Sequence, residues 1–218
     1  MPKTLIAVPC MNMVHTEFLT SILGLQRIGE TRSNVTMSSL IYDARNMMAG
    51  NAVDGGFDRV LWLDSDMKFD SDLMKRLMTD MDENNLDYVC GLYFMRKYPT
   101  APVVYKNLIY DRQPEQIRLK AEPYYDYPQD QLFEVDGSGF GAVLVKVDAI
   151  KKVHENFGMP FSPMMGFGED ISFCWRLKQL GIKMYCDSRA KLEHLATFPV
   201  MEAHYLQQKA EGKVVRDD

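Results

Sequence analysis

Short apolar runs and amphipathic stretches alternate along the first hundred residues. The apolar runs predict four strands, at 5–8, 34–37, 59–63 and 88–92. Apolar residues at helical spacing predict three helices, at 15–28, 40–53 and about 70–84. Gly55 and Gly56 give a strong stop signal after the second helix. This alternation predicts an α/β protein with a mainly parallel sheet flanked by helices on both faces.

The pattern changes from about residue 98. Further strands are predicted at 102–110, 131–135, 141–147, 183–186 and 191–195, and helices at 149–156 and 169–180. A polar, tyrosine-rich segment joins the first two of these strands, and a loop rich in glycine and proline at 158–168 is expected to be mobile. A polar tail follows, with a helix expected around 201–210. Because no repeat or linker is visible, residues 1–218 are expected to form one domain.

Composition narrows the classes of function. Of the 218 residues, 46% are hydrophobic and 25% charged, and the net charge of −5 argues against a broad nucleic-acid or anionic-membrane surface. No apolar run approaches the roughly 20 residues of a membrane span, and the first apolar run is too short for a signal peptide. The four cysteines are scattered, which favours reduced thiols and a cytoplasmic location.

The most informative stretch is the apolar run that ends in Asp64-Ser65-Asp66, an Asp-x-Asp motif. A continuously apolar strand suits a parallel sheet buried on both faces, and ligands bind at the carboxyl ends of such strands. Side chains alternate along extended backbone, so Asp64 and Asp66 are expected on the same side. Two carboxylates placed there could hold a divalent cation and, through it, a phosphate. A plain polar strand end explains the pattern about equally well.

Two further groups of residues could carry chemistry. Glu169 and Asp170 begin a predicted helix after the glycine-rich loop, where a carboxylate serves either as a helix cap or as a general base. His194 lies near the end of the last predicted strand. A single histidine in such a place is more often structural than a metal ligand.

Several familiar sites are excluded. An EF-hand would need glycine where Phe69 stands and glutamate where Lys75 stands. The histidines and cysteines lack zinc-site spacing, and no Walker loop or Gly-x-Gly-x-x-Gly follows the first strand. A pyrophosphate would therefore have to be held by a metal rather than by a glycine-rich turn.

These motifs together resemble a GT-A glycosyltransferase of the family 2 type. The resemblance rests on Ile6-Ala7-Val8-Pro9, Ala44-Arg45-Asn46, Leu63-Asp64-Ser65-Asp66, Gly137-Ser138-Gly139-Phe140-Gly141-Ala142, Gly168-Glu169-Asp170 and His194, which occur in the family's order over roughly 4–196. It implies a GT-A, Rossmann-like fold with a mixed, mainly parallel sheet and a small second antiparallel sheet. It also implies a nucleotide-binding half at 1–97, an acceptor and catalytic half at 98–196, and a tail at 197–218.

The resemblance also implies roles. The donor would be a nucleotide-sugar, with UDP the commonest choice, and Mn²⁺ or Mg²⁺ would bridge its diphosphate. Asp66 would be the direct metal ligand, His194 a further metal ligand, and Asp64 would contact the ribose or the metal shell. Asp170 would be the general base, with Glu169 as the alternative. The residues implied in donor binding are Pro9, Arg45, Asn46, Asp64, Ser65, Asp66, Gly139 and Gly141. An inverting reaction is expected.

The acceptor is open: a glycan, a lipid-linked saccharide, a protein or a modified nucleic acid. Arg96, Lys97 and the tyrosines of 124–127 are candidates for the acceptor side. The processive synthases' Gln-x-x-Arg-Trp motif and membrane helices are missing, which argues against a polysaccharide synthase. Two alternative functions remain, a sugar nucleotidyltransferase and a catalytically idle nucleotide-sugar-binding module.

Overall fold

A computed structural model describes residues 2–97, 99–112, 117–164 and 166–197, together with 202, 206, 210 and 211. Its strands are β1 (Lys3–Cys10), β2 (Glu30–Met37), β3 (Arg59–Leu63), β4 (Met67–Lys68), β5 (Tyr88–Leu92), β6 (Val104–Arg112), β7 (Ile117–Pro123), β8 (Leu132–Val135), β9 (Gly137–Ser138), β10 (Ala142–Lys146), β11 (Met184–Lys191) and β12 (Glu193–His194). Its helices are α1 (Thr16–Gly24), α2 (Ile41–Asp54), α3 (Leu73–Glu83), α4 (Val147–Phe157) and α5 (Glu169–Gln179).

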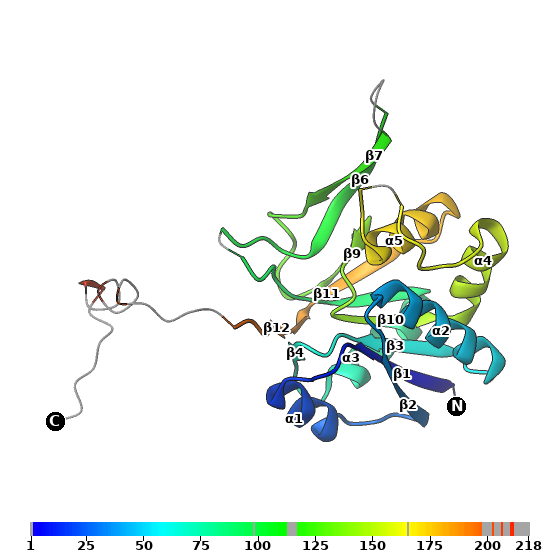
Figure 1. The fold of residues 1–218 in the computed structure, drawn as a ribbon, viewed down its shortest axis with the longest axis horizontal. Coiled ribbons are helices and arrows are strands. Elements are labelled where there is room, and N and C mark those ends of the chain that lie inside the picture. Colours follow the sequence, from blue (N-terminus) through cyan, green and yellow to red (C-terminus); the bar gives the residue numbers. More distant parts are fainter. Residues whose placement is uncertain are drawn as a thin grey trace.

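A seven-stranded sheet in the order β2-β1-β3-β10-β5-β11-β8 forms the centre of the molecule (Figure 1). The strands β2, β1, β3, β5 and β11 run parallel, whereas β10 and β8 run antiparallel to their neighbours. Two small antiparallel sheets, β12-β4 and β7-β6-β9, complete the fold. The mixed, mainly parallel sheet with a small second antiparallel sheet is therefore confirmed.

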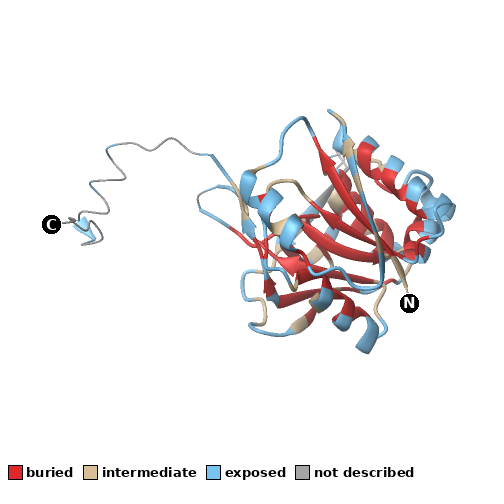
Figure 2. Cartoon of the chain, turned by 90° about the horizontal axis from the view of Figure 1, so that it is seen from below, coloured by how far each residue is buried: buried red, intermediate tan, exposed pale blue. Residues whose placement is uncertain are grey.

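Helices cover both faces of the large sheet. Every residue of β3 is buried, as its continuous apolar run predicts. Alternation along β3 turns Trp62 toward α2, where it packs against Arg45, and turns Arg59 to the opposite face, where it pairs with Asp82 of α3. The helices α2, α4 and α5 contact one another on the first face, and Figure 2 shows the buried strands between the helical layers.

Several elements differ from the sequence expectation. The helix predicted at 15–28 ends at Gly24, since Leu25 already has extended backbone angles, and β2 begins at Glu30 rather than at 34. The segment predicted as a tyrosine-rich connection contains β7, which pairs with β6 as a hairpin that projects from the body (Figure 1). The helix expected around 201–210 lies almost wholly outside the described residues.

The loop at 158–168 is anchored. Arg176 of α5 donates from Nη1 to the Pro160 carbonyl (2.9 Å) and from Nη2 to the Ser162 carbonyl (2.7 Å), and the Met164 amide donates to Ser172 Oγ (2.8 Å). Phe161 is fully buried. The expectation of a mobile loop is therefore wrong over residues 160–164, because side chains of α5 replace the solvent as hydrogen-bond partners of its backbone.

Candidate active site

The candidate site begins where β3 ends. The Asp64 amide donates to the Gly141 carbonyl (3.1 Å), and the Met67 amide donates back to the Asp64 carbonyl (3.2 Å). The second bond closes a turn over residues 64–67, so the motif does not continue the extended strand. Strand alternation therefore does not apply to Asp64 and Asp66, and their two carboxylates contact different partners.

Asp64 belongs to a buried cluster centred on Arg45 of α2. Arg45 is 2% exposed and donates from Nη2 to Asp64 Oδ1 (2.7 Å) and from Nε to Glu169 Oε1 (3.1 Å). Its guanidinium lies 4.9 Å from the centre of the Phe140 ring and 5.7 Å from that of Trp62. Arg45 therefore fixes the two carboxylates from within the core, and it does not lie on an exposed helix face. Burial raises the pKa of Asp64, and the charge of Asp66 adds to this rise, although Arg45 opposes it.

Asp66 belongs to a second cluster, which is more accessible. Its Oδ2 lies 2.7 Å from Nη1 of Arg96 and 3.5 Å from Nε2 of His194. The strand β12 brings His194 there, because it pairs antiparallel with β4 and because the Leu195 amide donates to the Asp66 carbonyl (2.8 Å). Burial acts to raise the pKa of Asp66, but the hydrogen bond with His194 and the charge of Arg96 outweigh it and lower that pKa.

The hydrogen bonding of His194 fixes its tautomer. Nδ1 lies 2.9 Å from the carbonyl oxygen of Phe94, and a carbonyl only accepts, so Nδ1 carries a proton. In the neutral ring Nε2 then presents its lone pair to the Asp66 carboxylate. A proton or a metal cation between two facing acceptors removes their repulsion, and Asp66 Oδ2 is in addition paired with Arg96. A metal-binding histidine commonly donates its other ring N–H to a backbone carbonyl in this way.

The Asp66–His194 separation fits a metal ion. Two atoms that bind one ion at about 2.1 Å each can lie up to about 4.2 Å apart, and the observed 3.5 Å falls within this limit. It also exceeds the roughly 2.7–2.9 Å of a strong N⁺–H···O⁻ hydrogen bond. In the described part of the chain no three acidic, histidine or cysteine side chains gather as a metal group. A metal held here would therefore need further ligands from phosphate and water, which is usual for a metal–nucleotide site.

Asp170 lies at the start of α5. Its Oδ1 accepts the Ile171 amide (2.7 Å), whereas its neighbour Glu169 pairs with Arg45. Burial and, after it, the charge of Glu169 raise the pKa of Asp170 to about 6. Asp170 thus changes its protonation near neutral pH, as a general base must, while Glu169 is held in an ion pair.

The remaining predicted site residues have structural contacts. A Cβ at Gly139 or Gly141 would meet the Tyr93 ring, so both glycines make room for this buried tyrosine, whose hydroxyl accepts the Gly141 amide (3.3 Å). Asn46 accepts the Phe161 amide through Oδ1 (2.9 Å). Pro9 is buried in β1, and Ser65 lies in the turn between the two aspartates; their role in donor binding stays a prediction.

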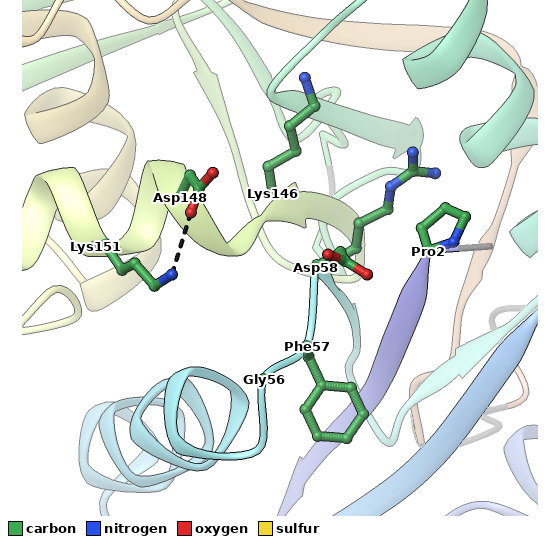
Figure 3. A pocket seen from close by; sticks show the side chains of 8 residues that line it. Pro2, Gly56, Phe57, Asp58, Lys146, Asp148 and Lys151 are labelled. Carbon is green, nitrogen blue, oxygen red and sulfur yellow. Dashed lines mark hydrogen bonds and ion pairs between the residues drawn. The ribbon is translucent and has the colours of Figure 1, made fainter.

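A cavity of about 590 Å³ lies at the opposite, amino edge of the sheet (Figure 3). Its charged lining residues already have partners: Lys151 pairs with Asp148 (3.2 Å), and Lys146 pairs with Asp87 (3.0 Å), which lies outside the lining. This cavity contains no facing carboxylate and imidazole of the kind that Asp66 and His194 form.

Comparison with known proteins gives the fold its name. No protein-family model matches the sequence, and no curated protein matches it. Among solved structures, A197 from STIV is similar with a TM-score of 0.61 and 18% identity, over 89% of this chain and 86% of that one. GalNAc-T7, crystallised with UDP, GalNAc and Mn²⁺, is similar with a TM-score of 0.62 and 10% identity, over 90% of this chain and 44% of that one.

The chain has a GT-A fold. This chain spans less than half of the GalNAc-T7 chain. The GT-A fold was predicted from the motifs, and the match confirms it without confirming family 2. Within the described residues no helix is long and apolar enough to cross a membrane.

Sequence reasoning missed two contacts of this GT-A site. Arg96 was expected on the acceptor side, yet it pairs with Asp66. The Phe94 carbonyl that orients His194 carries no sequence signal at all, because a backbone group is present at every residue.

Proposed function

We propose that this protein is a metal-dependent glycosyltransferase, which transfers a sugar from a nucleotide-sugar, with UDP as the first nucleotide to test, to an acceptor hydroxyl. One observation carries the proposal: Nε2 of His194 faces Asp66 Oδ2 at 3.5 Å, while Nδ1 is tied to a backbone carbonyl. This pair lies just past the end of β3, the sheet edge at which α/β folds bind their ligands. The GT-A neighbour crystallised with UDP and Mn²⁺ supports the same assignment.

Asp66 and His194 are the residues that would hold the ion. Mixed carboxylate and imidazole ligation suits Mn²⁺ somewhat better than Mg²⁺. A bound divalent cation would stabilise the negative charge that the diphosphate gains as the anomeric bond breaks. Asp64, held by Arg45, lies next to the pair and would contact the ribose or the ligands around the ion.

Asp170 is proposed as the general base. It would take the proton of the acceptor hydroxyl as that oxygen attacks the anomeric carbon, while the sugar passes through an oxocarbenium-like state. Direct attack of this kind inverts the anomeric configuration. The ion pair of Glu169 with Arg45 favours Asp170 over Glu169, because the Glu169 carboxylate is already bound to a buried cation. In this proposal residues 1–97 bind the nucleotide and 98–196 supply most of the acceptor and catalytic groups.

Hydrolysis of a UDP-sugar tests the proposal without knowledge of the acceptor. We expect slow hydrolysis that requires Mn²⁺ and is lost in Asp66→Ala and in His194→Phe. Glu193→Ala is a matched control, since Glu193 neighbours His194 but pairs with the exposed Lys68 (2.8 Å).

Three outcomes separate the alternatives. Metal-dependent UDP binding without turnover across a panel of nucleotide-sugars would favour a catalytically idle binding module. Release of pyrophosphate from a nucleoside triphosphate and a sugar phosphate would favour a nucleotidyltransferase. If the purified protein shows neither metal-dependent nucleotide binding nor turnover, the enzyme proposal fails.

A further inference from the structure

Arg96 contacts the carboxylate oxygen of Asp66 that the proposed metal ion would bind. Its Nη1 lies 2.7 Å from Asp66 Oδ2, which is the same oxygen that His194 Nε2 faces. A guanidinium and a divalent ion cannot both contact that oxygen on the side of the imidazole without strong repulsion between the two cations. Contact of Asp66 Oδ2 with Arg96 and contact of the same oxygen with a metal ion therefore exclude each other.

The backbone just before Arg96 is hydrogen-bonded, whereas the Arg96 side chain is accessible. The Met95 amide donates to the Ala101 carbonyl (2.9 Å), and Phe94 forms a bridge with Pro102. Phe94 also holds His194 through its carbonyl. The Arg96 side chain, by contrast, is 47% exposed. The guanidinium can therefore leave Asp66 by rotation of its own side chain, without moving the histidine.

The local charges indicate which group the Arg96 guanidinium contacts after it leaves Asp66. Asp66 and Arg96 together are neutral, so a divalent ion that replaces Arg96 on the carboxylate leaves a local charge of about +2. A diphosphate carries the opposite charge, and a planar guanidinium suits phosphate oxygens as well as it suits a carboxylate. A bound metal ion would thus attract the diphosphate, and a bound diphosphate would draw Arg96 away from Asp66 and free the carboxylate for the metal ion.

We propose that Arg96 is an exchange residue, which neutralises Asp66 in the free protein and moves to the donor diphosphate when a divalent ion takes its place. This inference rests on the proposed function, because it needs Asp66 to be the metal ligand. Its consequence is coupling: the ion and the diphosphate bind more tightly together than separately, and by linkage each strengthens the other by the same factor.

The exchange makes two predictions of opposite sign for Arg96→Ala. Without nucleotide, Mn²⁺ should bind about fivefold more tightly, because the ion no longer competes with a half-exposed ion pair. In saturating Mn²⁺, UDP should bind about tenfold more weakly, because a charge-assisted contact to phosphate is lost. A residue that only supported the fold would weaken both.

The experiment measures free Mn²⁺ by electron paramagnetic resonance and UDP binding by calorimetry, both on the full chain. Lys97→Ala is the matched control, since it removes one positive charge from the neighbouring residue, and Arg96→Lys should lie between wild type and Arg96→Ala. Asp66→Ala reports on the proposed function itself: if it binds Mn²⁺ as wild type does, the metal site is elsewhere and both proposals fail. If Mn²⁺ binding depends on Asp66 but Arg96→Ala matches Lys97→Ala in both titrations, the exchange alone is refuted.

Discussion

Replacing Arg45 with methionine tests whether the buried cluster is held together by its one cation. Methionine keeps an unbranched chain of similar reach but removes the guanidinium that donates to Asp64 and Glu169. Glu169 then has a buried charge without its partner, since its side chain is only 12% exposed. Asp64 is 26% exposed, so water compensates for part of the lost ion pair with Arg45.

The expected cost follows from these exposures. Removing one partner of a buried ion pair costs about 3–5 kcal/mol, because the remaining charge stays desolvated. The pair with the wetter Asp64 adds about 1 kcal/mol or less. For a chain of this length the loss corresponds to a fall in Tm of roughly 10 °C.

The destabilisation should depend on pH. The pKa of Asp64 is raised in the folded protein, so the folded state holds more protons than the unfolded state and stability falls as pH rises. Without Arg45, which acts to lower it, that pKa rises further. Arg45→Met should therefore lose more stability at pH 7.5 than at pH 5.

Urea denaturation followed by circular dichroism measures the effect. Arg59→Met is the matched control: Arg59 is also buried (7% exposed, against 2% for Arg45), but its partner Asp82 is 53% exposed, so a cost of about 1 kcal/mol or less is expected. The double variant Arg45→Met/Glu169→Gln should recover part of the loss, because no ionised glutamate remains buried. If Arg45→Met costs no more than the control at either pH, the cluster does not depend on its cation.

Three shorter predictions concern other residues. Asp170→Asn should retain UDP binding while transfer slows by about 10²–10⁴, and wild-type kcat should rise with pH through about 6 as Asp170 ionises; unchanged transfer would remove it as the base. Burial and a neighbouring carboxylate raise the pKa of Asp80 to about 6, so wild-type Tm should fall as pH rises from about 4 to 6, and Asp80→Asn should flatten that dependence in scanning calorimetry. Gly139→Ala should cost about 1–3 kcal/mol by overpacking against the tyrosine ring, whereas Gly24→Ala, with open space around it, should be neutral or stabilising in the same denaturation assay.

The local pattern of apolar residues predicted the buried strands well. The strands at 59–63 and 88–92 have the expected bounds, because a continuous apolar run has no stable place except between two covered faces of a sheet. The hairpin strand β7 was missed. Its partner β6 lies outside the large sheet, and pairing with a neighbouring strand, rather than a strongly apolar pattern, defines it.

The polar residues of α5 show that helical periodicity alone does not predict which face of a helix is exposed. Helical spacing over 169–180 places Ser172 and Arg176 on a polar face, yet both are buried and hold the loop at 160–164. Sequence periodicity reports which residues share a face of a helix, but it does not report whether another segment of backbone covers that face.

The sequence by itself determined the strand that presents Asp64-Ser65-Asp66 and the order of the motifs that led to the GT-A fold. Only the tertiary structure decided the partners of each carboxylate: Arg45 for Asp64, and Arg96 with His194 for Asp66. The physical reason is that apolar burial and backbone pairing are encoded locally, in periods of a few residues. A charge, in contrast, is balanced by whichever groups the fold brings within a few ångströms, here from positions up to 128 residues apart along the chain.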